Sequence, residues 1–214
     1  MTELFNNGFE EGDFSAWTST TGTPTIVSDW VHHGTYSEFV NSAEYASETL
    51  TDINTVFGRA YVKFSTLPTS NAYRCSVLSF HPSGFLGYPI YATAYKDTAD
   101  SLVKWAIRNH YNNTWAISDT QVQTGVEYLV ELKYTRNGAN VLYLDGVELV
   151  SGANSPNIAI VQFSAGSPLS HQGSVWIDCV VVGDAYIGPE AAAGLSIPVA
   201  MHHYGHLINK IIRG

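Results

Sequence analysis

Charged side chains are scarce in this sequence. Asp, Glu, Lys and Arg together make up 14% of its 214 residues, against about a quarter in an average soluble domain. Basic residues are the scarcer kind, with 10 Lys and Arg against 19 Asp and Glu and a formal net charge of −9. Because nucleic-acid binding needs clustered Lys and Arg to neutralise phosphates, we expect no nucleic-acid partner. The polar surface must instead consist largely of Ser, Thr, Asn, Gly and Tyr, a composition common in extracellular and virion proteins.

Cysteine is also rare. The two cysteines, Cys75 and Cys179, both lie in apolar strand-like runs. Neither belongs to a CxxC pair, which argues against a zinc ribbon. Two buried thiols acting as small apolar groups are the favoured interpretation. A disulfide stays open, because it would need the two Cα atoms to lie about 4.4–6.8 Å apart, and the sequence does not give that distance.

Long apolar runs are missing as well. No segment is long enough to span a bilayer, so a membrane partner is not expected. Residues 1–5 have neither the basic nor the apolar region of a signal peptide. The polar composition favours an extracellular or virion-surface location. With no signal peptide visible, the chain would be cytoplasmic at synthesis, exported in a mature form, or assembled into a particle inside a cell.

Alternating apolar and polar residues dominate the chain, whereas helical periodicity is absent before residue 190. The clearest case is residues 126–134, where Val, Tyr, Val, Leu and Tyr alternate with residues that include Glu127, Glu131 and Lys133. Asp145-Gly146 between two apolar runs is a strong signal for a two-residue hairpin turn. Roughly a dozen short strands with turn signals between them predict an all-β sandwich of two antiparallel sheets.

One apolar stretch, residues 173–184, is β-branched, almost uncharged and bounded by glycine. It predicts a strand buried on both faces, and its best distant partner is the opening segment, residues 3–5. If these ends pair, residues 1–189 form one closed domain. Residues 190–214 then form a linker and an amphipathic tail.

Four segments resemble the concanavalin A-like lectin/glucanase superfamily in its laminin-G-like jelly-roll form. They are residues 7–17 (NGFEEGDFSAW), residues 58–68, residues 130–149 with their Asp-Gly turn, and residues 176–189, where Cys179 replaces a commoner acidic residue. The resemblance implies a two-sheet antiparallel jelly-roll β-sandwich, here with a short C-terminal helical or extended tail. The superfamily includes hydrolases, lyases, lectins and non-enzymatic coat or adhesion domains, so the fold does not decide the function.

Catalytic motifs are missing from the sequence. Glycoside hydrolysis needs two carboxylates beside the scissile bond, and related glucanases carry them on one strand as ExDxE. Here Leu129 stands between Glu127 and Glu131, and we interpret the two glutamates as a solvated strand face. The Arg, Gln-x-His and Tyr-Lys motifs of alginate lyases on this fold are absent too. We therefore expect a non-catalytic protein, with a polysaccharide hydrolase or lyase as the less favoured alternative.

Aromatic and polar side chains gather in one predicted hairpin. Flat rings cover the apolar faces of sugars, while Asn and Arg bind hydroxyl groups, so this hairpin is the candidate glycan-binding site. The alternative is that Trp105 and some of the tyrosines are simply core. The predicted glycan-binding residues are Trp105, Arg108, His110, Tyr111, Asn112, Trp115 and Tyr88, with Tyr91 and Tyr95 nearby in the sequence.

The junction of the two chain ends could hold Ca²⁺. In many sandwiches of this type a cation lies near the first and last strands, bound by carboxylate and carbonyl oxygens. The side chains available are Glu10, Glu11, Asp13 and Asp178. The alternative is that they cap turns or carry surface charge.

The last 25 residues or so differ from the rest. Apolar residues recur there at helical spacing, namely Met201, Tyr204, Leu207, Ile208 and Ile211. Such a stripe could pack on its own domain, bind a membrane weakly, or dock onto another subunit. The last option predicts a homo-oligomer or a larger assembly, such as a virion decoration, a tail or an extracellular filament. The favoured function is thus a non-catalytic recognition or coat module, and the alternative is a free lectin-like carbohydrate-binding module.

Overall fold

The computed structural model describes residues 1–41, 43–83, 89–167 and 172–190, and every regular element in these ranges is a β-strand. Within them no helix is long and apolar enough to cross a membrane. The strands are β1 (Glu3–Asn7), β2 (Ser19–Thr21), β3 (Thr25–Val27), β4 (Ser37–Asn41), β5 (Tyr45–Ile53), β6 (Thr55–Thr66), β7 (Arg74–Pro82), β8 (Ile90–Lys96), β9 (Val103–Asn109), β10 (Thr114–Gln121), β11 (Glu127–Thr135), β12 (Asn140–Leu144), β13 (Val147–Gly152), β14 (Ile160–Gly166) and β15 (Ser174–Gly183).

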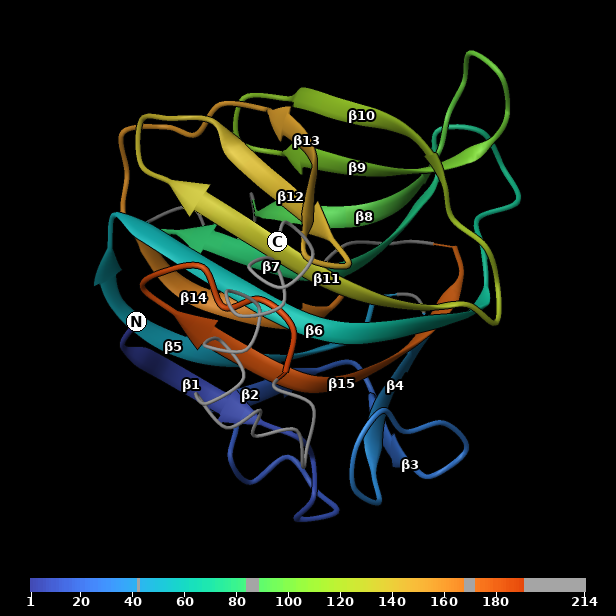
Figure 1. The fold of residues 1–214 in the computed structure, drawn as a ribbon, viewed down its shortest axis with the longest axis vertical. Coiled ribbons are helices and arrows are strands. Elements are labelled where there is room, and N and C mark those ends of the chain that lie inside the picture. Colours follow the sequence, from blue (N-terminus) through green and yellow to red (C-terminus); the bar gives the residue numbers. More distant parts are fainter. Residues whose placement is uncertain (42, 84–88, 168–171, 191–214) are drawn as a thin grey trace, which may run out of the picture.

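These strands form two antiparallel sheets that stack face to face. The first, sheet A, has the order β13-β12-β11-β6-β15-β4-β3, with β1 also paired to β15. The second, sheet B, has the order β10-β9-β8-β7-β14-β5-β2. Figure 1 shows β11, β6 and β15 crossing in front of β7 and β14. The predicted fold class, a two-sheet antiparallel β-sandwich, is therefore confirmed.

β15 lies in the middle of sheet A, as the apolar stretch predicts. It pairs with β6 on one side, and on the other with β4 and then β1, where Asn7 is opposite Val180 and Glu3 is opposite Gly183. Nearly all of its side chains are buried. The predicted pairing of the opening and closing segments is thus confirmed, and the two ends of the described sandwich meet in one sheet.

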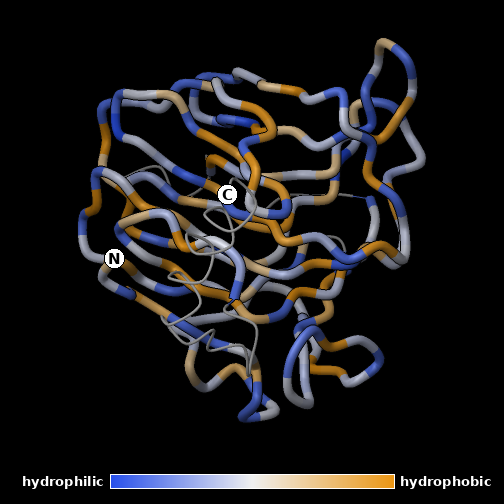
Figure 2. The backbone as a smooth tube through the Cα atoms, viewed as in Figure 1, coloured by the Kyte–Doolittle hydropathy of each residue, from blue (hydrophilic) through white to orange (hydrophobic). Residues whose placement is uncertain are grey.

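The core lies between the two sheets and is built from one face of each strand. Trp105 on β9 is completely buried there, edge-on to Phe64 and Tyr128 at centroid distances of 5.7 and 5.4 Å. Gly58 on β6 allows the sheets to approach, because a Cβ at this position would lie 2.6 Å from the ring of Phe163. Figure 2 shows apolar and polar residues alternating along the strands, as such a two-faced sheet requires.

The predicted hairpin is present between β12 and β13. Asp145 and Gly146 both have positive φ, 51° and 82°, as a type I′ turn demands. The alternation in β11 also points its apolar residues into the core.

The interpretation of Glu131 as solvated is wrong. Its side chain is buried and accepts hydrogen bonds from the backbone N–H groups of Ile187 (2.8 Å) and Gly188 (2.9 Å). The reason is that residues 184–190 fold back over the outer face of sheet A. Arg59 on β6 fixes the same segment, donating to the carbonyl of Gly188 at 3.1 Å and pairing with Glu190 at 2.9 Å. Glu190 therefore contacts the sandwich, while the predicted tail that follows it lies outside the described residues.

Both cysteines are buried and free, as favoured from the sequence. Cys75 is on β7 of sheet B and Cys179 is on β15 of sheet A. Burial raises the pKa of the Cys75 thiol to about 12. The pKa of Cys179 is raised as well, by burial and by the charges of Asp178 and Glu190.

Candidate functional site

The outer face of sheet B, away from the core, is unusually polar. On β8 the side chains of Ile90, Ala92 and Ala94 belong to the core, so the alternate residues Tyr91, Thr93 and Tyr95 must face outward. Pairing then extends this face across the sheet. Its polar members on the neighbouring strands are Arg74, Ser76, Ser79 and His81 on β7, Lys104 and Arg108 on β9, and Ser164 on β14.

Two arginines and three aromatic residues converge on this face, and we call them the arginine–aromatic cluster: Arg74, Tyr91, Tyr95, Arg108 and Trp115. Trp115 on β10 is directly opposite Arg108 on β9, whose guanidinium lies 4.7 Å from the indole centroid. Tyr95 packs against the same indole, with its ring centroid 4.4 Å from that of Trp115. The guanidinium of Arg74 lies 5.5 Å from the ring centroid of Tyr91.

The cluster has an accessible rim and a buried floor. Arg74, Arg108 and Trp115 are half-buried, whereas Tyr91 has no exposed surface. Burial raises the pKa of the Tyr91 hydroxyl, and the two guanidinium groups act in the opposite direction. Burial lowers the pKa of Arg74; nearby Tyr91 opposes this shift, whereas the positive charge of Arg108 adds to it. The site therefore concentrates positive charge beside flat apolar rings.

A buried polar row continues this face toward β14. The Nε2 atom of His81 is within hydrogen-bonding distance of the hydroxyl oxygens of Ser79 (3.3 Å) and Ser164 (3.0 Å). Small hydroxyl side chains lie beside it, with Thr93 and Ser76 paired across β8 and β7. These side chains are almost completely buried, so they support the accessible rim of the cluster from below.

Among the residues predicted from the hairpin, the structure brings Arg108 and Trp115 together and separates Trp105 from them. The prediction that Trp105 covers a sugar does not fit its position, because its side chain points into the core and is 0% exposed. The reason is the two-residue period of a strand, which places residues 105 and 108 on opposite faces.

The other predicted hairpin residues lie in or beyond the turn. Tyr111 and Asn112 are exposed, and Asn109 holds their backbone by accepting from both N–H groups, at 3.0 and 3.4 Å. His110 is half-buried and its N–H donates to the carbonyl of Pro89. Tyr88 lies outside the described residues.

Sequence reasoning missed Arg74, and it noted Tyr91 and Tyr95 only as neighbours in the chain. The alternation Tyr91-Thr93-Tyr95 does signal a shared face. Nothing local, however, connects Arg74 with Arg108, 34 positions later in the chain. Only the pairing of β7 with β8 and of β8 with β9 places them over the same tyrosine.

The four predicted calcium ligands have other partners. Glu10 accepts hydrogen bonds from the backbone N–H groups of Thr35 (2.9 Å) and Tyr36 (3.1 Å). Asp178 accepts from the N–H groups of His32 (2.8 Å) and His33 (3.1 Å). The two carboxylates thus stabilise one loop, residues 32–36.

The other two carboxylates accept hydrogen bonds from residues close to them in the sequence. Asp13 accepts from the N–H of Ser15 at 2.8 Å, and Glu11 from the side-chain amide of Asn7 at 3.3 Å. In the part of the chain that the structure describes, these four acids do not form a group of potential metal ligands. The structure therefore gives no support to a calcium site made by them, because each carboxylate already has its own N–H donors.

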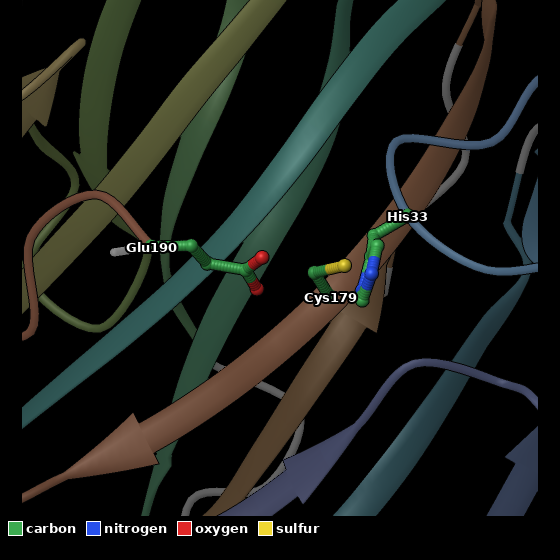
Figure 3. Close-up of side chains that lie close together, drawn as sticks. All are labelled: His33, Cys179 and Glu190. Atoms are coloured by element: carbon green, nitrogen blue, oxygen red, sulfur yellow. The ribbon is translucent and has the colours of Figure 1, made fainter. Parts of the chain in front are cut away.

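A different trio does come together. Figure 3 shows His33, Cys179 and Glu190 pointing toward one another, and their potential ligand atoms all lie within 4.8 Å. Nitrogen, sulfur and oxygen ligands of this kind suit a cation such as Zn²⁺. Burial nevertheless favours the protonated thiol of Cys179, and Glu190 is already paired with Arg59. The contacts that fix residues 184–190, together with those of Asp178 and Glu10 that fix the loop at residues 32–36, account for this trio.

The predicted assembly tail, including Met201, Tyr204, Leu207, Ile208 and Ile211, lies outside the described residues.

No protein-family model and no curated protein matches this chain. Solved structures do resemble it. The cellulose-induced protein Cip1 has a TM-score of 0.66 at 14% identity, covering 86% of this chain and 99% of its own. Domain 4 of AbnA, an extracellular arabinanase from Geobacillus stearothermophilus, in complex with arabinotriose, has a TM-score of 0.60 at 16% identity, covering 86% and 92%. The binding domain of botulinum neurotoxin DC in complex with SialylT has a TM-score of 0.54 at 8% identity, covering 86% and 48%.

These likenesses show a shared fold. They agree with the β-sandwich that the resemblance to concanavalin A-like proteins implies, and at such low identity they carry nothing about individual site residues.

Proposed function

We propose that this protein is a non-catalytic, concanavalin A-like glycan-binding module whose sugar site is the arginine–aromatic cluster. The observation that carries the proposal is the half-exposed indole of Trp115, which contacts both the ring of Tyr95 and the guanidinium of Arg108. An indole held by two neighbouring side chains is rigid, so binding a sugar against its exposed surface would cost little side-chain entropy.

The chemistry around the indole fits the same ligand. The apolar face of a sugar ring can stack on Trp115, while hydroxyl groups at its edge meet the half-buried Arg74 and Arg108. Solved structures of similar fold support the proposal in a general way, because two of them are complexes with arabinotriose and SialylT.

The proposal that the protein is non-catalytic rests on where its carboxyl groups lie. Hydrolysis of a glycosidic bond needs two carboxyl groups flanking it, and the arginine–aromatic cluster contains none. Glu131, a catalytic candidate considered from the sequence, is buried in the outer layer of sheet A and binds backbone N–H groups.

Glycan-array binding followed by calorimetric titration tests the proposal. Trp115→Ala should weaken binding at least about tenfold, a loss of about 1.4 kcal/mol. Trp176→Ala is the matched control, because Trp176 is a half-buried indole on the outer face of sheet A, packed on Phe39 at 5.3 Å. It should bind as the parent does. Absence of glycan binding by the parent, or equal effects of the two substitutions, would contradict the proposal.

Assembly through residues 190–214, in a virion or an extracellular filament, stays a prediction beside this function.

A further inference from the structure

Arg74 and Arg108 carry positive charges that no acidic side chain neutralises. Among the described residues neither forms an ion pair. The segments outside the described ranges contain no Asp or Glu in the sequence, so they cannot supply a side-chain carboxylate either. Carboxylates are nevertheless in excess in this chain, which has 19 acidic and 10 basic residues.

The two most buried cations in the described structure do have carboxylate partners. Lys104, on the same face of sheet B, lies 3.2 Å from Asp97 and 2.6 Å from Asp100. Arg59, on the opposite sheet, lies 2.9 Å from Glu190. The fold thus supplies carboxylates to its most buried cations, Arg59 and Lys104, but not to Arg74 or Arg108.

The two guanidinium groups also retain unused donors. The Nε atoms of Arg74 and Arg108 are buried and have no hydrogen-bond partner among the described residues. An unsatisfied buried donor and two like charges close together both destabilise a folded protein. A ligand that brings negative charge would offset the repulsion between the two guanidinium groups, and a carboxylate matches the planar edge of a guanidinium with two parallel hydrogen bonds.

We propose that the sugar bound at the arginine–aromatic cluster is acidic, with its carboxylate held by Arg74 and Arg108 while its ring stacks on Trp115. The ligand class is therefore a glycan containing uronic or sialic acid. This inference rests on the proposed function and adds the charge of the ligand to it.

The test is calorimetric titration with a panel of acidic oligosaccharides: galacturonate, guluronate, mannuronate and glucuronate oligomers and sialyllactose. Each is compared with its own methyl ester, which keeps the ring and removes the charge. Sulfated neutral oligosaccharides form a third arm. At least one free acid should bind about tenfold or more tightly than its ester, and the difference should shrink as salt is raised.

Substitutions of single arginines then test which of them bind the carboxylate of the ligand. Arg74→Gln and Arg108→Gln should each weaken binding of the free acid more than binding of the ester, so that the ratio of the two affinities falls toward one. Arg136→Gln is the control, because Arg136 is an exposed arginine bound to Asn54 and Asn157 far along the sequence from the cluster. β-Sheet circular dichroism checks that each variant is folded.

The outcomes separate the two proposals. If neutral glycans or esters bound as tightly as the acids, and Trp115→Ala abolished that binding, the proposal of an acidic ligand would be overturned. The proposed glycan-binding function would still hold. Binding of the sulfated oligosaccharides alone would also contradict the proposal that the two arginines recognise a carboxylate. Absence of binding to any glycan on the array or in the panel would overturn both.

Discussion

Two tryptophans in the β9–β10 hairpin should behave in opposite ways when they are removed. Trp105 is fully buried and contacts Phe64 and Tyr128 edge-on, so Trp105→Ala should cost about 3–5 kcal/mol of unfolding free energy, as for other large core residues. In a domain of this size each kcal/mol lowers the melting temperature by about 2–4 °C. A fall of roughly 6–20 °C is therefore expected.

Trp115 contributes less to stability and more to binding. Its removal loses one aromatic pair, about 0.5–1.5 kcal/mol, and one cation–π contact with Arg108, about 0.5–1 kcal/mol. The melting temperature of Trp115→Ala should thus fall by about 2–10 °C, and its β-sheet circular dichroism should match that of the parent. Its glycan affinity should drop at least about tenfold.

Trp105→Phe completes the comparison. The indole Nε1 of Trp105 has no hydrogen-bond partner among the described residues, so phenylalanine loses packing volume but no hydrogen bond. This variant should be moderately destabilised and should bind glycans as the parent does. If Trp105→Phe weakened binding as much as Trp115→Ala while differential scanning calorimetry showed both to be folded, the assignment of the two faces would be refuted.

Three further predictions concern buried carboxyl groups and the tail. Glu131→Gln should lose about 1–3 kcal/mol in thermal denaturation, since an amide oxygen cannot serve both N–H donors of residues 187–188 as a carboxylate does; an unchanged melting temperature would contradict this anchoring role. Glu38 is fully buried on the core-facing side of β4, and burial raises its pKa well above the ordinary 4.5. The folded state therefore retains this proton more tightly than the unfolded state, and stability should fall as pH rises above about 4.5 until the folded pKa is passed. Glu38→Gln should remove that contribution in denaturant titrations across pH, each unit of elevation being worth about 1.4 kcal/mol; an unaltered pH profile would argue against it. Deleting residues 191–214 should leave the β-sheet circular dichroism intact and reduce the native mass measured by light scattering; an unchanged mass would contradict assembly through the tail.

Much of the fold could be predicted from the sequence because its signals are local. Alternation shows which residues of a strand share a face, and Asp145-Gly146 can adopt the two positive φ angles that a tight hairpin needs. The β-branched composition of residues 173–184 is enough to indicate a strand covered on both faces. Even the separation of Trp105 from Arg108 follows from counting, since an odd difference in position places two strand residues on opposite faces.

The site depended on information that no local pattern contains. Which face of a strand becomes core, and which strands become neighbours, are decided by packing of the two sheets and by hydrogen-bond register across the whole chain. That register brings Arg74 and Arg108 to Tyr91 from two different strands. It also brings residues 184–190 over Glu131, turning an expected surface charge into a buried anchor. The sequence by itself determined the strands, their turns and the composition of each face, whereas only the tertiary structure decided which charges meet and which are left without a partner.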